Sequence, residues 1–178
     1  MAQAKKRKKF FDVELPIINK TTQLQAYEIE ELDGRFVNYD LTRALRGKSV
    51  LLSSKIIVKN GEITSTPRQI MLMPYFLRRM IRKGTNYVED SFSTNCKNAT
   101  IRIKPFLITR RKVSREVRKA LRNKAREELI DYVKNKDVKI FFEEVLTNHI
   151  QKILSLKLRK IYPLALCEIR MLKVEKEL

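Results

Sequence analysis

Alternating apolar and polar residues predict several strands along the chain. The clearest alternation places isoleucines on one face and Arg102 and Lys104 on the other, until Pro105 marks an edge or a bulge. Asn60-Gly61 tolerates the positive φ of a tight turn and joins two further strands as a hairpin. The predicted strands span residues 35–41, 55–59, 62–64, 99–109 and 166–174.

Apolar residues spaced three and four positions apart predict three helices. The first opens with Pro74 in its first turn and is expected to end near Gly84. The last covers residues 140–158 and ends before Tyr162-Pro163. Its expected buried stripe is Phe142, Leu146, Ile150, Ile153 and Leu154.

The helix that begins at about Ser114 has the clearest periodicity. Its apolar stripe is Val113, Val117, Ala120, Leu121 and Ala125. Because each residue turns a helix by about 100°, a row of arginines is expected on the opposite side. That row is Arg111, Arg115, Arg118, Arg122 and Arg126.

These elements predict an α+β protein. The chain has 178 residues, of which 43% are apolar, and this is enough to bury a core. Only 4 Gly and 5 Pro exclude fibrous and low-complexity classes, and no repeat or flexible linker divides the sequence. We therefore expect one domain over residues 10–178, preceded by a basic arm at residues 1–9.

Three features favour a soluble, cytoplasmic protein. Cys96 and Cys167 are too few for a disulfide framework or a Cys-rich zinc site, which indicates a reducing compartment. No segment approaches the roughly 20 apolar residues of a membrane span. Asp12 and Glu14 closely follow the basic N-terminus, so a secretory signal is not predicted.

Net charge is the strongest functional signal in the sequence. The 39 Lys and Arg against 20 Asp and Glu give a formal charge of +19 and an isoelectric point near 10.1. Residues 110–136 hold eleven cations and four acids, whereas residues 12–40 hold seven acids and two cations. This balance favours a polyanionic partner, because clustered Lys and Arg neutralise phosphates and release condensed counterions.

Four basic patches supply the candidate contacts. A single patch is more often a solvated face, but four with little compensating acid favour a partner that wraps the chain. The pentamer at 5–9 is equally compatible with a nuclear-localisation signal or a disordered arm. The basic strand segment Ile101-Arg102-Ile103-Lys104 carries no aromatics, so phosphate and shape recognition is expected rather than sequence reading. The candidate RNA contacts are Lys5, Lys6, Arg7, Lys8, Lys9, Arg78, Arg79, Arg82, Lys83, Arg110, Arg111, Lys112, Arg115, Arg118 and Arg122.

The sequence offers little for catalysis, and we expect neither an enzyme nor a bound cofactor or metal. His149 is the single histidine and is expected on a helix surface. Glu143 and Glu144 are adjacent on a helix and point about 100° apart. All four glycines are isolated, which excludes a phosphate-cradling loop.

Motifs along nearly the whole chain match one known family in order. The most specific is residues 160–164, followed by Glu168-Ile169-Arg170 and Leu172-Lys173-Val174. Earlier matches are Phe10-Phe11 with Leu15-Pro16, Gly34-Arg35 with Val37 and Leu41, Tyr75 to Arg82, Ile101 to Phe106, and Val117-Arg118. Together these segments resemble the S-three-a family of archaeal and eukaryotic small-subunit ribosomal proteins. Phe10 stands where that family commonly has Trp.

The resemblance implies an antiparallel β-barrel-like sheet packed by two or three helices, with a disordered basic N-terminal arm. It implies a structural constituent of the small ribosomal subunit in the cytoplasm, on the platform near the mRNA exit, with no active site. Its partners would be small-subunit rRNA and neighbouring platform proteins, but no membrane, and direct mRNA contact is left open. The acidic stretch at residues 28–33 is the candidate protein-facing or solvent-facing surface.

Three other classes remain as alternatives. A free-standing basic RNA- or DNA-binding protein, such as a chaperone, would share the charge and the helix pattern but would not sediment with small subunits. A peripheral membrane protein is less favoured, because the basic helix has Val and Ala on its apolar face rather than Trp, Phe or Leu. An enzyme would depend on His149.

Overall fold

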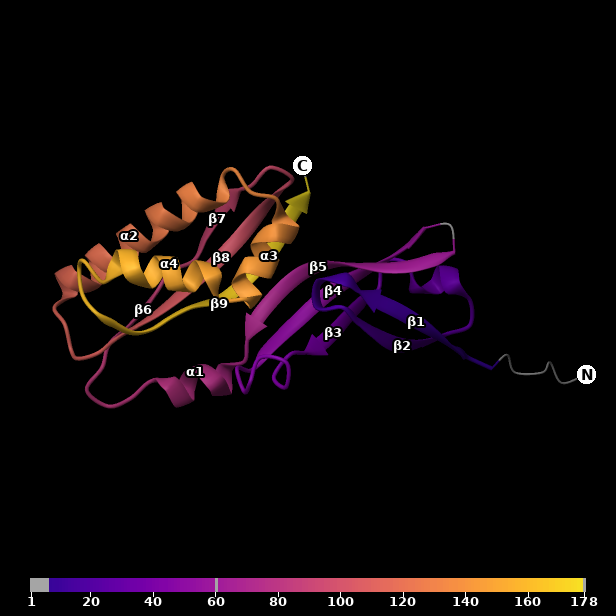
Figure 1. The fold of residues 1–178 in the computed structure, drawn as a ribbon, viewed down its shortest axis with the longest axis horizontal. Helices are drawn as coiled ribbons and strands as arrows, with labels where there is room; N and C mark the ends of the chain where they lie inside the picture. The colour runs from indigo at the N-terminus through magenta and orange to yellow at the C-terminus, as the bar shows by residue number, and fades with distance from the viewer. Residues whose placement is uncertain (1–6, 60, 178) are drawn as a thin grey trace, which may run out of the picture. The chain divides into compact units, whose positions relative to one another are not determined.

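The structure, a computed structural model, describes residues 7–59 and 61–177 and has an α+β fold, as predicted (Figure 1). Of the predicted basic arm, Lys5 and Lys6 lie outside the described residues, as does Asn60 of the predicted turn. Arg7 and Lys8 are exposed and precede the first strand.

The described residues group into two compact units. The smaller unit contains the chain up to Tyr39 together with Leu52–Arg68. The larger unit contains Asp40–Leu51 and the residues from Gln69 onwards. The single domain expected over residues 10–178 stays a prediction.

The smaller unit contains a two-stranded antiparallel sheet. Its strands are β1 (Lys9–Leu15) and β2 (Lys20–Ala26), with Phe11 opposite Leu24. A short 3-10 turn at Pro16–Ile18 joins them. The core of this unit consists of Val13, Ala26, Leu32, Val37 and Ile56, against which Phe11, Leu24, Val58 and Ile63 pack.

A second sheet has the hydrogen-bonded order β3-β4-β5-β9-β8-β6, and β7 pairs with β8 beside this path. Its strands are β3 (Phe36–Asp40), β4 (Val50–Lys59), β5 (Glu62–Leu72), β6 (Tyr87–Glu89), β7 (Phe92–Asn95), β8 (Ala99–Thr109) and β9 (Leu164–Glu177). Among the described residues the path ends at β3 and β6, so the antiparallel sheet is open and is not a closed barrel.

The predicted strands are all present. In β8 the alternation of apolar and basic residues matches the burial of the side chains. Ile101 and Ile103 are buried and Arg102 is exposed, as the alternation predicted. The register with β9 shifts between Lys104 and Pro105, which confirms the predicted irregularity at the proline. Beyond it every residue of β8 is buried, because this part of the strand lies between β9 and β6.

In the described part of the chain four helices complete the larger unit, rather than two or three. They are α1 (Pro74–Met80), α2 (Arg115–Val133), α3 (Val138–Leu146) and α4 (His149–Leu158). The last three lie together over one face of β8 and β9 (Figure 1). Helix α1 ends at Met80, before Gly84, so Arg82 and Lys83 follow the helix instead of lying on its surface.

The helix expected over 140–158 is interrupted at Asn148. This residue takes a φ of 60°, which lies in the left-handed region and stops α3 from continuing into α4. Its Oδ1 accepts a hydrogen bond from Lys48 Nζ at 2.5 Å, and that Nζ also lies 2.7 Å from Glu168 Oε2. The break therefore coincides with a partly buried ion pair that the helical spacing does not reveal.

Candidate nucleic-acid interface

The most basic segment of the larger unit runs from Arg110 to Arg122 and holds seven cations and one acid, Glu116. Its first residues form the loop after β8. Asn86 holds this loop, since its Oδ1 accepts a hydrogen bond from the Val113 backbone N–H at 2.9 Å. The Thr109 hydroxyl also lies 2.7 Å from the carbonyl oxygen of Arg111. The exposed side chains of Arg110, Arg111 and Lys112 thus project from an anchored loop.

Helix α2 follows this loop with a defined N-terminus. The Ser114 side chain accepts a hydrogen bond from the Val117 backbone N–H at 3.4 Å and caps the first turn. Arg115 and Arg118 are three residues apart, and Arg122 follows four residues later. This spacing places the three guanidinium groups on one side of the helix.

The arginine row does not lie opposite the buried face, as the sequence pattern predicted. Arg118 is two turns before buried Ala125, so both point to the same side of the helix. Arg118 is half-buried, and its Nε is shielded without a hydrogen-bond partner among the described residues, whereas Ala120 is exposed. The expectation failed because the buried residues recur at every fourth position and rotate the stripe by about 40° per step. These residues are Leu121, Ala125, Leu129 and Val133.

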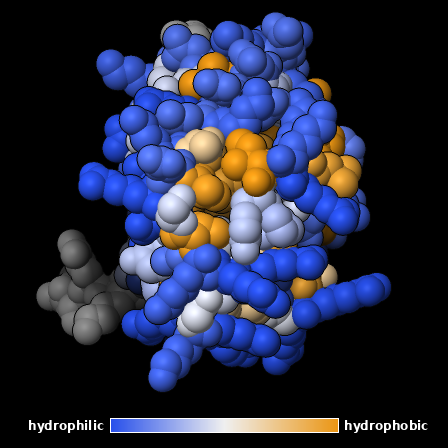
Figure 2. All heavy atoms as spheres, turned by 90° about the vertical axis from the view of Figure 1, so that its left-hand side faces the viewer, coloured by the Kyte–Doolittle hydropathy of each residue, from blue (hydrophilic) through white to orange (hydrophobic). Residues whose placement is uncertain are grey.

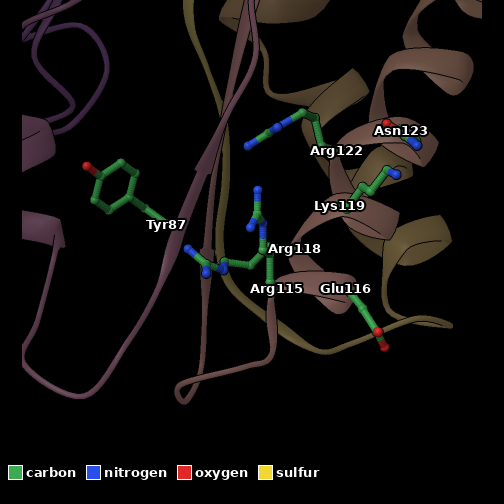
Figure 3. Close-up of a pocket in the computed structure, with 7 residues that line it drawn as sticks. All are labelled: Tyr87, Arg115, Glu116, Arg118, Lys119, Arg122 and Asn123. Atoms are coloured by element: carbon green, nitrogen blue, oxygen red, sulfur yellow. The ribbon is translucent and has the colours of Figure 1, made fainter.

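The arginines line an open cavity of about 710 Å³. Figure 3 shows Arg115, Arg118 and Arg122 extending from α2 toward the strand that carries Tyr87, while Glu116 points away from them. The residues that line the cavity are Tyr87, Arg115, Glu116, Arg118, Lys119, Arg122 and Asn123. The cavity is therefore strongly cationic, and its single carboxylate is not directed at the guanidinium groups.

A second cavity of about 540 Å³ shares Arg122 with the first. Side chains of both charge signs line this second cavity. Arg170 Nη1 contacts Glu89 Oε2 at 3.0 Å, and Asp90 also lines it. Lys104 is its remaining cation. The excess of positive charge thus belongs to the cavity at the start of α2.

The two halves of α2 differ in whether their cations form ion pairs. In the second half Lys124 contacts Glu128 at 3.3 Å, and Lys157 of α4 contacts the same carboxylate. Hydrogen bonds from these lysines hold the pKa of Glu128 below its ordinary value. Among the residues that the structure describes, none of the cations from Arg110 to Arg122 pairs with a carboxylate. Their charge is available to an external anion.

The other predicted contacts within the described residues are exposed but lie elsewhere. Arg78 and Arg79 occupy the last turn of α1, where the Arg79 guanidinium lies 5.7 Å from the centre of the Phe76 ring. Arg82 and Lys83 are in the following loop. None of these four lines the cavity at the start of α2. In the smaller unit Lys9 begins β1, and Lys8 Nζ lies 5.6 Å above the Tyr27 ring.

Sequence reasoning missed Tyr87, the aromatic residue of the cavity. Its side chain belongs to the three-residue strand β6, which is too short to produce a recognisable alternation. The ring is 52% exposed and stacks on Phe106 of β8, with centroids 5.9 Å apart and planes inclined by 20°. In Figure 3 the ring extends from β6 to the side of the strand away from Arg115, Arg118 and Arg122, so it does not face the guanidinium groups.

At the end of the larger unit where α2 begins, the surface combines hydrophilic and hydrophobic side chains. Figure 2 faces this end and shows hydrophilic side chains surrounding a smaller area of hydrophobic atoms. A chain of sugar, phosphate and base presents the same mixture of charge and apolar faces. The surface therefore suits nucleic acid better than a purely apolar partner.

The structure provides no competing chemistry at the residues that it describes. No three His, Cys, Asp or Glu side chains in these ranges are grouped closely enough to hold a metal ion. His149 is exposed at the start of α4, with Nδ1 3.4 Å from the Tyr132 hydroxyl. Glu144 forms an ion pair with Lys136. No helix in the described part of the chain is long and apolar enough to cross a membrane.

An α+β chain with a surplus of unpaired cations around one open cavity has the character of a polyanion-binding protein. The chain belongs to the Ribosomal S3Ae family, whose model matches residues 2–177. A similar curated protein is the small ribosomal subunit protein eS1 of Nanoarchaeum equitans (strain Kin4-M). It is 28% identical over 180 residues, which cover 96% of this chain and 90% of the relative.

This membership confirms the resemblance to the S-three-a family of archaeal and eukaryotic type. The chain is a ribosomal protein that acts in translation, and its location is the cytoplasmic ribosome. Its role is structural and not enzymatic, as the sequence predicted.

Proposed function

We propose that the chain is a constituent of the small ribosomal subunit that binds small-subunit rRNA through phosphate and shape contacts. The unpaired cations from Arg110 to Arg122 carry this proposal. Four of them line one cavity and the other three flank it on an anchored loop, so they can contact several phosphates of one RNA segment at once. Each contact releases condensed counterions, and the affinity grows with their number.

Further contacts are proposed for the remaining basic patches. The exposed cations after and within the last turn of α1 add a second phosphate site, and the N-terminal cations up to Lys9, which begins β1, add a third. The acidic stretch at residues 28–33, which contains the 3-10 turn Ile29–Leu32, would face a neighbouring ribosomal protein. The proposed location is the platform near the mRNA exit, next to other platform proteins and within reach of mRNA.

Sedimentation tests the assignment to the small subunit. A native lysate is run on a sucrose gradient at moderate and then at high salt, and the chain is followed by immunoblot. We expect it to travel with small subunits and full ribosomes at both salt concentrations. If it stays near the top of the gradient or dissociates completely at modest salt, a free-standing basic RNA- or DNA-binding protein is the better account.

A matched pair of charge variants tests the cavity itself. One variant carries Arg115→Gln, Arg118→Gln and Arg122→Gln; the control carries Lys124→Gln, Lys134→Gln and Lys157→Gln, which removes the same charge from ion-paired positions. Binding to small-subunit rRNA is measured over a range of salt. The arginine variant should lower the slope of log K against log salt by about 2, and the control by much less. Equal slopes for the two variants would contradict the proposed interface.

A further inference from the structure

We propose that the outer edge of β3 binds an extended, Lys- and Arg-rich segment of a neighbouring protein, which adds to the sheet as a further strand. The inference rests on the proposed function, since it names the chemistry of the protein that the acidic stretch at residues 28–33 would face. It assigns to this stretch and to Phe36 the selection of a basic partner.

The position of β3 in its sheet carries the first step. Among the residues that the structure describes, β3 lies at the end of the sheet and hydrogen-bonds to a strand, β4, on one side alone. The backbone N–H and C=O groups along such an edge pair readily with an extended chain from another protein. With five residues, β3 has an ordinary strand length and offers several of these groups.

Aromatic side chains lie beside this edge. Val37 is 6% exposed and belongs to the core of the smaller unit, whereas Phe36 points to the opposite face of the strand and is 64% exposed. Glu31 connects the exposed Tyr27 to the start of β3, because its Oε2 accepts the Tyr27 backbone N–H at 3.0 Å and lies 3.8 Å from Arg35 Nη2. Two exposed rings therefore flank the acidic stretch.

Charge identifies the class of partner. From residue 10 onwards the smaller unit has five cations and seven acids, whereas the larger unit has 29 cations and 13 acids. Glu28, Glu30, Glu31 and Asp33 are exposed in the stretch that leads into β3. Such a surface repels an RNA backbone and also the same stretch of a second copy, whereas Lys and Arg side chains gain ion pairs there.

Aromatic rings next to carboxylates bind cations in particular. The chain already shows this chemistry in the smaller unit, where Lys8 Nζ lies 5.6 Å from the centre of the Tyr27 ring. Phe36 presents a further ring to an ammonium or guanidinium group of the partner. Ion pairs and cation–π contacts would thus choose the partner, while backbone pairing along β3 would hold it extended.

The test measures binding of the full chain to a labelled decapeptide that alternates Lys and Val. We expect binding that weakens as salt rises, with protection of β3 backbone amides from hydrogen exchange. One control peptide has the same side chains but is N-methylated throughout, so it has no N–H donors for pairing and should not bind. A second control that alternates Glu and Val should not bind either.

Two pairs of variants isolate the side chains of this surface. Glu30→Lys should weaken peptide binding about fivefold, whereas Glu127→Lys, the same charge change at an exposed position of α2, should bind as the wild type does. Phe36→Thr should weaken binding about threefold, and Leu156→Gln, which removes an exposed apolar side chain of α4, should not. Circular dichroism and a thermal melt check that each variant is folded.

The outcomes separate this inference from the proposed function. Full binding of the N-methylated peptide, equal binding of the Lys and Glu peptides, or exchange protection away from β3 and residues 28–33 overturns strand addition. Displacement of the peptide from β3 by an rRNA fragment would assign this edge to RNA and also overturn it. The peptide measurements themselves use no rRNA, so their failure leaves the rRNA proposal in place. If sedimentation fails while the peptide binds, the basic segment belongs to a partner outside the ribosome, which overturns the assignment to a neighbouring ribosomal protein.

Discussion

At the scale of single residues, Cys167 shows how burial sets chemistry in this chain. It lies in β9, where burial and the neighbouring Glu168 carboxylate raise the pKa of its thiol to about 12. Burial also raises the pKa of Cys96, whose Sγ lies 2.9 Å from the carbonyl oxygen of Ala99. Both thiols therefore stay protonated and unreactive in the folded chain at neutral pH.

The raised pKa of Cys167 predicts a pH-dependent stability. Below about pH 8.5 the thiol is protonated in both the folded and the unfolded state, and its contribution is constant. Above that pH the unfolded chain loses the proton first, so the free energy of unfolding should fall by up to about 1.4 kcal/mol per pH unit. Urea denaturation of the wild type and of Cys167→Ala between pH 8 and 10 measures the difference, and parallel pH profiles would contradict the assignment.

At the scale of elements, the ends of helices decide where charge is presented. The Ser114 cap starts α2 directly after the basic loop, and the first two turns then carry Arg115 and Arg118. At the other end of the helical layer, Asn148 breaks the predicted helix and orients its Oδ1 toward Lys48. Short polar residues therefore position both the basic cavity and the partly buried ion pair.

The cap predicts a measurable cost when it is removed. Ser114→Ala should lower the free energy of unfolding by about 1 kcal/mol, because the Val117 N–H loses its acceptor. Ser114→Asp should be at least as stable as the wild type, because Asp also caps a helix and its negative charge favours the helix N-terminus. Denaturation in urea at fixed salt provides the comparison. Identical midpoints for all three proteins would show that the 3.4 Å contact does not cap the helix.

At the scale of the whole molecule, the formal charge of +19 is the dominant property. Ion pairs compensate part of this positive charge, mostly in the second half of α2 and between strands. One example is Arg102 with Glu175 at 2.7 Å. The cations around the cavity remain unpaired within the described residues. A chain with such net charge repels itself when it has no polyanionic partner.

We therefore expect the RNA-free chain to be poorly stable at low salt and to gain stability as salt screens the repulsion. Thermal melts between about 20 and 300 mM salt test this, and the variant with Arg115→Gln, Arg118→Gln and Arg122→Gln should melt higher than the wild type at the lowest salt. A cooperative, salt-independent melt of the wild type at low salt would contradict the expectation.

The sequence by itself determined the strands β3, β4, β5, β8 and β9, the start of the basic helix and the candidate cations. Alternation is a local property, so β3 and β8 were evident, and the serine before the basic helix and Pro74 mark helix starts through local backbone chemistry. The motifs also sufficed to identify the family. These signals depend on residues close together in the chain.

Only the tertiary structure decided which face of α2 is buried and what lies beside it. The apolar stripe drifts around the helix, and the strands that it contacts come from residues well before it in the sequence, so spacing alone placed Arg118 on the wrong side. Tyr87 precedes Arg115 by 28 positions and belongs to a strand too short to recognise. A cavity formed by segments so far apart is fixed by packing, because no local pattern records which side chains meet.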